Sequence, residues 1–220
     1  MARERLYGKT LEELAAITTA ASMPVYAARQ IAGWLYRRGA PEISTMTDLS
    51  LAARNLLQEG YETGLTPPSA AATGSDGTKK YLFPVSNNRF IETAFIPDRD
   101  RATVCLSVQS GCRMGCHFCM TARQGFQGNL TSNEILNQYR SLPEHELLTN
   151  IVYMGMGEPL DNLTEVLKSL EILTSAWGYG WSPTRITVST VGITGRIEEF
   201  LEKSRCHLAV SLHSPFDDER

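Results

Sequence analysis

The stretch GCRMGCHFCMTARQGF, residues 111–126, decides the fold. It places Cys112, Cys116 and Cys119 in one short loop with the spacing CxxxCxxC. Three thiolates at this spacing can hold three irons of a [4Fe–4S] cube and leave the fourth iron open to a small molecule. The loop therefore favours one-electron chemistry over a purely structural role.

Two other interpretations of this loop stay open on the residues alone. Zinc also prefers cysteine sulfur, but a structural zinc site takes four ligands, commonly as two CxxC or CxxC and HxxxH pairs. No second pair is present, and His117 lies between two of the cysteines, where its ring would hardly reach the same metal. Inert, packed cysteines are the other alternative. A disulfide framework is not expected, because 220 residues can bury an ordinary core.

The composition is typical of a globular chain, with 42% hydrophobic and 20% charged residues. No apolar run is long enough to span a membrane, and the charged N-terminus lacks the apolar segment of a secretion signal. Clustered cysteines favour a reducing compartment, so we expect the cytoplasm. The net charge of −3 argues against a globally basic nucleic-acid binder. Arg29, Arg37 and Arg38 nevertheless form a small basic group that could meet phosphate.

The first part of the chain predicts helices. They are expected over residues 11–20, 25–39 and 47–59. Thr10 and Glu13 predict a capping box for the first helix, and Thr47 or Asp48 is expected to cap the third. Residues 66–78, rich in Pro, Gly, Ser and Thr, predict a linker.

After this segment the sequence predicts a β-hairpin over 79–85 and 89–97, and then alternating strands and helices. The strands are expected over 102–110, 150–155, 185–190 and 207–213, and the helices over 131–142, 163–177 and 195–203. Such alternation implies parallel pairing in an open α/β sheet or a (β/α) barrel. Active sites lie at the C-terminal ends of such strands, so the cysteine loop and the polar loops after the other three strands should converge.

Taken together, the motifs resemble those of radical S-adenosylmethionine enzymes, and more narrowly of the RlmN/Cfr family of RNA adenine methyltransferases. The resemblance covers nearly the whole chain and rests on IETAFIP, RATVCLSVQSGCRMGCHFC, TARQGFQGNLT, YMGMGEPLDN, TVSTVGI and LAVSLHSP, in family order. It implies an α/β fold with a partial, TIM-like (β/α) barrel, the first four strands of six, preceded by a small N-terminal helical domain. The expected division is 1–65 as an RNA-binding accessory domain, 66–78 as the linker and 79–220 as the barrel with its leading hairpin.

The resemblance also implies the cofactor site. Cys112, Cys116 and Cys119 would ligate a [4Fe–4S] cluster whose open iron takes S-adenosylmethionine. Glu158 matches a position beside the methionine amino group, with which its carboxylate would pair. The implied cofactor contacts are Gly157, Glu158, Ser189, Ser211, Leu212 and His213. On the residues alone, ordinary capping and turn chemistry explains these positions equally well.

Two catalytic residues are implied by the same resemblance. Cys105 matches a cysteine that resolves a covalent enzyme–RNA intermediate by forming a disulfide with a methyl-carrying cysteine. Glu92 matches the residue that removes a proton from the substrate carbon. On the residues alone, Cys105 could be a buried strand cysteine and Glu92 a glutamate facing solvent.

The implied reaction is methylation of C2 of an adenine in 23S rRNA, with tRNA as a further candidate substrate, through a methylated cysteine. An electron donor such as flavodoxin is implied, and we expect a monomer without a membrane partner. Three alternatives stay open. They are methylation of C8 by an enzyme of the same family, a radical enzyme acting on a small molecule, and a catalytically incomplete RNA-binding fragment.

The methyl-carrying cysteine of the family has no match in this chain. Only Cys206 follows the cluster loop, in a different context, and we assign it no catalytic role. With four strands in place of six, the strand at 207–213 would expose an unpaired edge. We therefore expect a fragment, a truncated product or a part that needs another chain. On its own it should bind a cluster poorly and not complete methylation.

Overall fold

The structure is a computed structural model that describes residues 3–214 and 216. The helices are α1 (Leu11–Ala20), α2 (Ala27–Ala32), η1 (Gly33–Arg38), η2 (Ile43–Thr45), α3 (Leu51–Gly60), α4 (Met120–Arg123), α5 (Ser132–Arg140), η3 (His145–Leu147), η4 (Pro159–Asn162), α6 (Leu163–Thr174), η5 (Pro183–Arg185) and α7 (Thr194–Lys203). The strands are β1 (Glu4–Arg5), β2 (Tyr61–Glu62), β3 (Ala70–Thr73), β4 (Lys79–Val85), β5 (Arg89–Asp98), β6 (Arg101–Cys105), β7 (Gln109–Ser110), β8 (Gly128–Asn129), β9 (Asn150–Tyr153), β10 (Ile186–Thr190) and β11 (His207–Val210).

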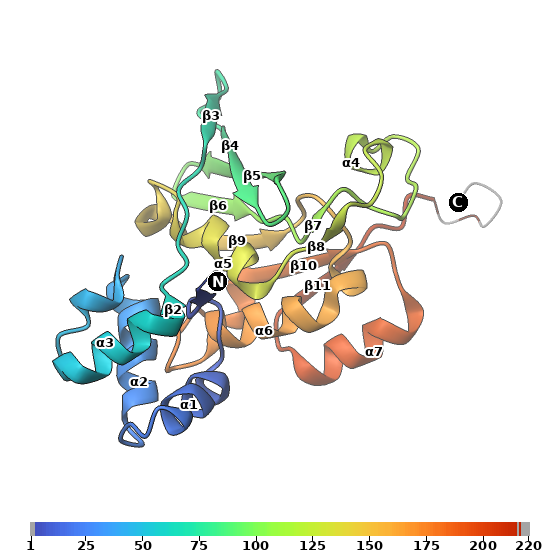
Figure 1. The fold of residues 1–220 in the computed structure, drawn as a ribbon. Helices are drawn as coiled ribbons and strands as arrows, with labels where there is room; N and C mark the ends of the chain where they lie inside the picture. The colour runs from blue at the N-terminus through green and yellow to red at the C-terminus, as the bar shows by residue number, and fades with distance from the viewer. Residues whose placement is uncertain (1–2, 215, 217–220) are drawn as a thin grey trace.

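The main sheet has seven strands in the order β11-β10-β9-β6-β5-β4-β3. Strands β6, β9, β10 and β11 pair in parallel, whereas β3, β4 and β5 continue the sheet antiparallel from β6. Figure 1 shows α6 and α7 side by side along the parallel strands, with α4 beyond the strand ends. The α/β class and the four parallel strands expected from the sequence are confirmed for the described residues.

The strand expected over 102–110 is broken in the middle. The ladder of β6 ends at Cys105. Beyond it, the buried side chain of Gln138 on α5, in place of a neighbouring strand, forms hydrogen bonds with the backbone N–H and carbonyl of Ser107. Its Oε1 accepts from Ser107 N and its Nε2 donates to Ser107 O, both at 2.8 Å. The chain then leaves the main sheet, and β7 pairs with β8 in a sheet of their own. This departure carries the cysteine loop outward from the strand ends.

The hairpin of β4 and β5 is found as expected, with Asn87 and Asn88 in the left-handed backbone region of its turn. The segment 66–78, expected as a linker, contains the strand β3, which pairs antiparallel with β4. All four residues of β3 are exposed, so edge pairing with β4, and not side-chain burial, places it. That is why its Ala-Thr run showed no alternation from which a strand could be predicted.

The N-terminal helices follow their expected boundaries except at two points. The capping box of Thr10 and Glu13 is present on α1. The helix expected over 25–39 divides into α2 and the π-helical η1 before ending at Gly39, whose φ is 66°. Ser50 caps α3, in place of Thr47 or Asp48, because the Asp48 carboxylate instead accepts from the Trp34 indole.

An aromatic cluster joins the N-terminal helices to the α/β part. The hydroxyls of Tyr7 and Tyr179 lie 2.6 Å apart, and the Tyr36 and Tyr179 rings lie 5.6 Å apart. Tyr139 of α5 meets Tyr179 edge-on at 4.9 Å. Each such ring pair contributes about 0.5–1.5 kcal/mol beyond area burial. The N-terminal helices are therefore packed firmly against the α/β part.

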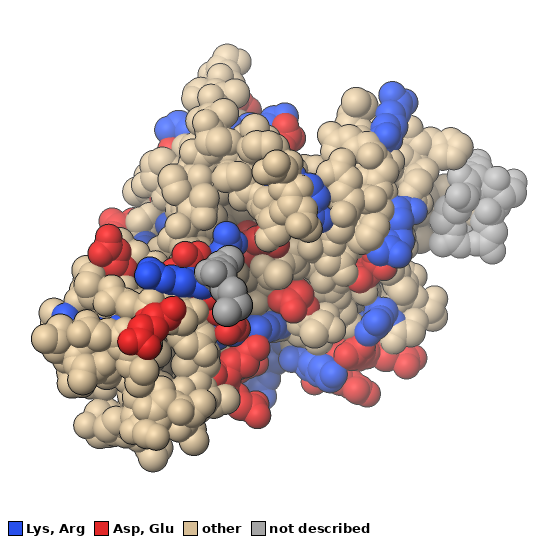
Figure 2. Space-filling view, in the orientation of Figure 1, with Lys and Arg blue, Asp and Glu red and all other residues tan. Residues whose placement is uncertain are grey.

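Packing also uses part of the expected basic group. Arg37 donates to the backbone carbonyls of Ala176 and Gly178, and Arg38 pairs with Asp48 at 3.3 Å. Acidic and basic side chains are interleaved over the face seen in Figure 2. Within the described residues no helix is both long and apolar enough to cross a membrane.

Asn133 is a buried polar link between the two parts, and its replacement by alanine is expected to destabilise the fold. The buried amide Nδ2 donates to the carbonyls of Tyr7 and Gly64, each at 3.0 Å, and Oδ1 accepts from Arg5. Asn133→Ala leaves the carbonyls of Tyr7 and Gly64 without this donor, so the free energy of unfolding should fall by about 1–3 kcal/mol. Urea unfolding measures it, with the exposed Asn55→Ala as control. Equal midpoints for the two variants would contradict this role.

Glu134 predicts an acid-sensitive contribution to stability. Burial raises the pKa of this carboxyl, but hydrogen bonds from the backbone N–H groups of Ser86 and Thr131 outweigh burial and hold the pKa below its ordinary value. The stabilisation is therefore complete above the unfolded-state pKa of about 4.3 and is lost as pH falls through the lower folded-state pKa. Glu134→Gln should cost about 2 kcal/mol at pH 7 and much less at pH 3. Urea unfolding across this range, with exposed Glu202→Gln alongside, measures the difference, and a pH-independent cost would refute it.

Candidate functional site

A cavity of about 330 Å³ opens at the C-terminal ends of the parallel strands. The cysteine loop, the loop after β9, the end of β10 and the segment after β11 all line it. The convergence of four loops expected from the sequence is therefore found. The sequence-predicted residues on its wall are Cys112, Cys116, Cys119, Gly157, Glu158, Ser189, Ser211 and His213.

The three loop cysteines are free thiols. Burial raises the pKa of the Cys112 thiol, and the neighbouring thiols of Cys116 and Cys119 raise it further. Metal binding to such thiols must release protons. Within residues 3–214 and 216, no three His, Cys, Asp or Glu side chains are grouped to hold a metal ion. The three thiols that line this cavity are thus not placed to share a single ion. A [4Fe–4S] cube is larger and takes each thiolate on a different iron, so these residues fit that group.

Glu158 is buried, 3% exposed, and its carboxylate joins two loops. Oε1 accepts from the Thr190 hydroxyl at 2.6 Å and from Leu160 N at 3.0 Å. Oε2 accepts from Val191 N at 3.0 Å. A carboxylate has about four acceptor positions, so about one remains for a ligand. The carboxylate thus fixes the loop after β9 to the end of β10, a role that the sequence did not predict.

A glycine is required at position 157, because the backbone there lies close to Gln109. Its φ is 97°, and a Cβ there would lie 2.4 Å from the Cβ of Gln109. Gln109 is fully buried, and its Oε1 accepts from Glu158 N at 2.9 Å. The loop after β9 can therefore lie directly on β7 only because residue 157 lacks a side chain.

The remaining predicted cofactor contacts lie on β10 and in the segment after β11. The hydroxyls of Ser189 and Ser211 are 3.3 Å apart. The ring of His213 meets that of Phe118 edge-on at 4.9 Å. Leu212, 53% exposed, lines an adjoining cavity of about 400 Å³. Ser189, Ser211 and His213 offer hydroxyl and imidazole groups to a ligand in the cavity, whereas Leu212 does not line it.

Cys105 and Glu92 do not line this cavity. Cys105 pairs with Ala94 across β6 and β5, and Glu92 lies two residues before Ala94, so the two predicted catalytic residues share one face of the sheet. Burial raises the pKa of the Cys105 thiol, against a hydrogen bond from the backbone of Met154 that lowers it. Glu92 is exposed and pairs with Lys80 at 3.2 Å. Its proximity to a substrate carbon remains a prediction.

All five cysteines, Cys105 included, are free. The structure therefore gives no support to the disulfide implied for Cys105.

Three polar residues around the site were missed by the sequence interpretation. They are Gln109, Asp161 and Thr190. Gln109 and Thr190 are almost completely buried, and Asp161 pairs with Arg113 at 2.9 Å. Their positions in QSG, PLD and STV carry no periodic or motif signal for contacts between loops that are distant in sequence.

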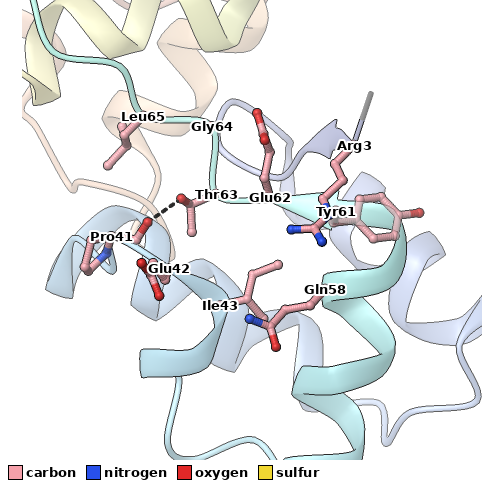
Figure 3. Close-up of a pocket in the computed structure, with 10 residues that line it drawn as sticks. All are labelled: Arg3, Pro41, Glu42, Ile43, Gln58, Tyr61, Glu62, Thr63, Gly64 and Leu65. Carbon is pink, nitrogen blue, oxygen red and sulfur yellow. Dashed lines mark hydrogen bonds between the residues drawn. The ribbon is translucent and has the colours of Figure 1, made fainter. Parts of the chain in front are cut away.

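A separate cavity of about 410 Å³ lies in the N-terminal region, between η2, α3 and β2 (Figure 3). Its charged lining mixes Arg3 with Glu42 and Glu62, and the Thr63 hydroxyl donates to Pro41 O on its wall. None of the sequence-predicted site residues lines it. We assign this cavity no role.

Comparisons with known proteins agree with this geometry. The family described as "Radical SAM superfamily" matches residues 106–220, and "Ribosomal RNA large subunit methyltransferase N-terminal domain" matches residues 5–62. A "Probable dual-specificity RNA methyltransferase RlmN" of Parabacteroides distasonis is 55% identical over 218 residues, covering 99% of this chain and 64% of the relative. A "Dual-specificity RNA methyltransferase RlmN" of Syntrophus aciditrophicus is 43% identical, over 100% of this chain and 64% of the relative.

Among solved structures, the crystal structure of a radical SAM methyltransferase from Sphaerobacter thermophilus matches with a TM-score of 0.89 and 39% identity, covering 99% of this chain and 66% of that one. The chain thus spans 64% of the length of the curated relatives above.

The parallel strands and the cysteine loop at their ends define a protein of the radical S-adenosylmethionine class. Within that class the chain belongs to the RlmN family, whose named members are RNA methyltransferases. The family implies a [4Fe–4S] cluster and S-adenosylmethionine as cofactors.

Proposed function

We propose that this chain is the cluster-binding and cofactor-binding part of an enzyme that methylates C2 of an adenine in 23S rRNA, and in tRNA, through a methylated cysteine. One observation carries the proposal: Cys112, Cys116 and Cys119 share a cavity with Gly157 and Glu158 at the ends of parallel strands. The names of the relatives, dual-specificity RNA methyltransferases, support RNA as the substrate class.

In this proposal the three thiolates hold a [4Fe–4S] cluster, which when bound supplies one electron for cleavage of the cofactor sulfonium. Glu158 anchors the loop that receives the methionine end of S-adenosylmethionine and offers it its remaining acceptor position. Ser189 and Ser211 present hydroxyls, and Leu212 and His213 an apolar and aromatic surface, to the rest of the cofactor.

On the neighbouring sheet face, Glu92 would accept a proton from the substrate carbon, and Cys105 would act on the covalent adduct. Both need a substrate positioned over β5 and β6. Lys80 at 3.2 Å already holds the Glu92 carboxylate, so proton transfer requires that exposed pair to open. No residue of the chain is assigned as the methylated cysteine.

For the rest of the chain, we propose residues 1–65 as an RNA-contacting domain, 66–78 as the connection that contains β3, and 79–220 as the first four strands of a six-stranded barrel. Arg29, which is exposed on α2, is a candidate phosphate contact. The proposal includes a flavodoxin-like electron donor, a monomeric state and a cytoplasmic location, to which five free cysteines are suited.

Anaerobic reconstitution of the chain with iron and sulfide tests the proposal. The sequence alone led to an expectation of poor cluster binding, but the three loop cysteines line one cavity. We therefore expect a [4Fe–4S] chromophore, an altered electron paramagnetic resonance spectrum on addition of S-adenosylmethionine, and 5′-deoxyadenosine after reduction. Mass spectrometry of adenines in 23S rRNA treated with the chain, and with a relative of full length, locates any methyl group at C2 or C8. Zinc in place of iron, or no spectral response to S-adenosylmethionine, would overturn the cofactor assignment, and a methyl group at C8 would overturn the C2 assignment.

A further inference from the structure

The cysteine loop makes few polar contacts with the rest of the protein. The backbone hydrogen bonds of residues 112–124 stay within the loop and its flanking strands, as between Cys119 N and Cys116 O. Considering only hydrogen bonds and ion pairs between described residues, the contact that leaves the loop is that of Arg113 Nε with Asp161 Oδ2, at 2.9 Å. Arg113 directly follows Cys112, so this contact acts on the backbone beside a proposed iron ligand.

Asp161 is also held by a contact outside the cysteine loop. It belongs to η4, and its side chain is 21% exposed. The same Oδ2 also accepts from Gln109 Nε2 at 2.7 Å. The same carboxylate oxygen therefore accepts from the uncharged, buried Gln109 and pairs with the charged Arg113.

Gln109 cannot reverse its amide. Its Oε1 faces the N–H of Glu158, which can only donate, at 2.9 Å. Its Nε2 faces the oxygens of Asp161 and Asn129, at 2.7 and 2.9 Å. Exchanging oxygen and nitrogen would place donors against donors and acceptors against acceptors. This fully buried side chain thus links the backbone of the cofactor loop to the carboxylate that meets the cysteine loop.

Arg113 also contacts the C-terminal side of the loop. Its Cζ lies 3.9 Å from the centroid of the Phe126 ring. A planar guanidinium can stack on a ring and bond a carboxylate in its own plane at once, which an ammonium cannot. Arg113 therefore connects the N-terminal side of the loop at Cys112, the C-terminal side at Phe126 and the helix η4.

We propose that Gln109, Asp161 and Arg113 form a positioning relay that sets the cysteine loop at a fixed place relative to the cofactor loop at Gly157 and Glu158. This inference rests on the proposed function, since it assigns the three residues to support of the cluster and cofactor site. They are positioning residues, because none of them lines the cavity. Their effect is on how firmly the cluster is retained and how well S-adenosylmethionine reaches it.

The competing explanation is an ordinary surface ion pair, because the Arg113 side chain is 52% exposed and such pairs contribute little. The chain offers a matched control in Arg101 and Asp98, an ion pair of 2.8 Å at the turn between β5 and β6, with side chains 68% and 57% exposed. Asp98→Asn removes the same charge from a similar pair away from the cavity.

The experiment compares Asp161→Asn, Arg113→Lys and their double variant with Asp98→Asn in the reconstituted full chain. Asparagine keeps an acceptor for Gln109 while removing the charge, and lysine keeps the charge while removing the stacking. Loss of cluster absorbance to a chelator should be on the order of tenfold faster in both single variants, as for other outer-shell partners of metal sites. The double variant should lose its cluster no faster than the less stable of the two single variants, because both substitutions break the same connection.

A second readout needs no cluster. In the cluster-free chain, hydrogen–deuterium exchange over residues 111–124 should be faster in Asp161→Asn than in Asp98→Asn, with equal urea midpoints for the two. If cluster loss and exchange both match the control, the relay is refuted while the proposed function stands. If the unsubstituted chain assembles no cluster, the proposed function fails, and faster exchange alone would then leave the relay as a loop restraint without its role at a cluster.

Discussion

Cys116→Ala is expected to abolish assembly of the iron–sulfur cluster. Cys116 shares the cavity wall with Cys112 and Cys119, and three thiolates are the fewest that hold three irons of the cube. Changes to outer partners of metal sites already cost 10–100-fold in affinity, so loss of a direct ligand should lower bound iron by at least about tenfold. Iron and sulfide analysis after anaerobic reconstitution measures this, together with 5′-deoxyadenosine formed after reduction.

Cys206→Ala is the matched control. Cys206 is also a free thiol. It is more buried than Cys116 and lies outside the cavity that holds the loop cysteines. This variant should keep the iron content and the spectral response to S-adenosylmethionine of the unsubstituted chain. If both alanine variants retained the cluster, Cys116 could not be a ligand. If both lost it, the loss would reflect a disturbed fold and not a missing ligand.

Secondary structure was predicted well wherever a local signal decided it. Thr131 and Glu134 form the expected capping box of α5, and the strongly periodic segment from 163 forms α6. The parallel strands also lie where short apolar runs predicted them, because buried strands are specified by their own side chains. The site followed from topology, since the ends of parallel strands meet at one edge of the sheet.

Features that depend on contacts between distant segments were not predictable in the same way. The break after Cys105 depends on Gln138, which lies more than thirty residues later on α5. The use of Arg37 in packing depends on carbonyls near residue 178. Glu158 was expected to face a ligand amine. Its carboxylate also accepts from the N–H groups of Leu160 and Val191 and from the hydroxyl of Thr190, which together take three of its about four acceptor positions. Sequence pattern names the residue types but does not say which partner satisfies each polar group.

Gly157→Ala is expected to cause a large loss of stability. At φ 97° an alanine is strained by about 1–3 kcal/mol. The new Cβ would also lie 2.4 Å from the Cβ of Gln109, which three hydrogen bonds hold in place, and overpacking of this kind costs about 1–3 kcal/mol more. We therefore expect the free energy of unfolding to fall by about 2–6 kcal/mol, measured by urea unfolding.

Gly192→Ala separates the two contributions. Gly192 has nearly the same backbone conformation, with φ 99°, but its nearest new neighbour would be Val210 Cγ1 at 3.9 Å, an ordinary contact. This variant should show the backbone strain alone, about 1–3 kcal/mol. The excess cost of Gly157→Ala then measures the close approach of the cofactor loop to Gln109, and it should be accompanied by weaker binding of S-adenosylmethionine. Equal costs would mean that the loop can move away from Gln109 freely. Gln109 would then not fix the position of the cofactor loop.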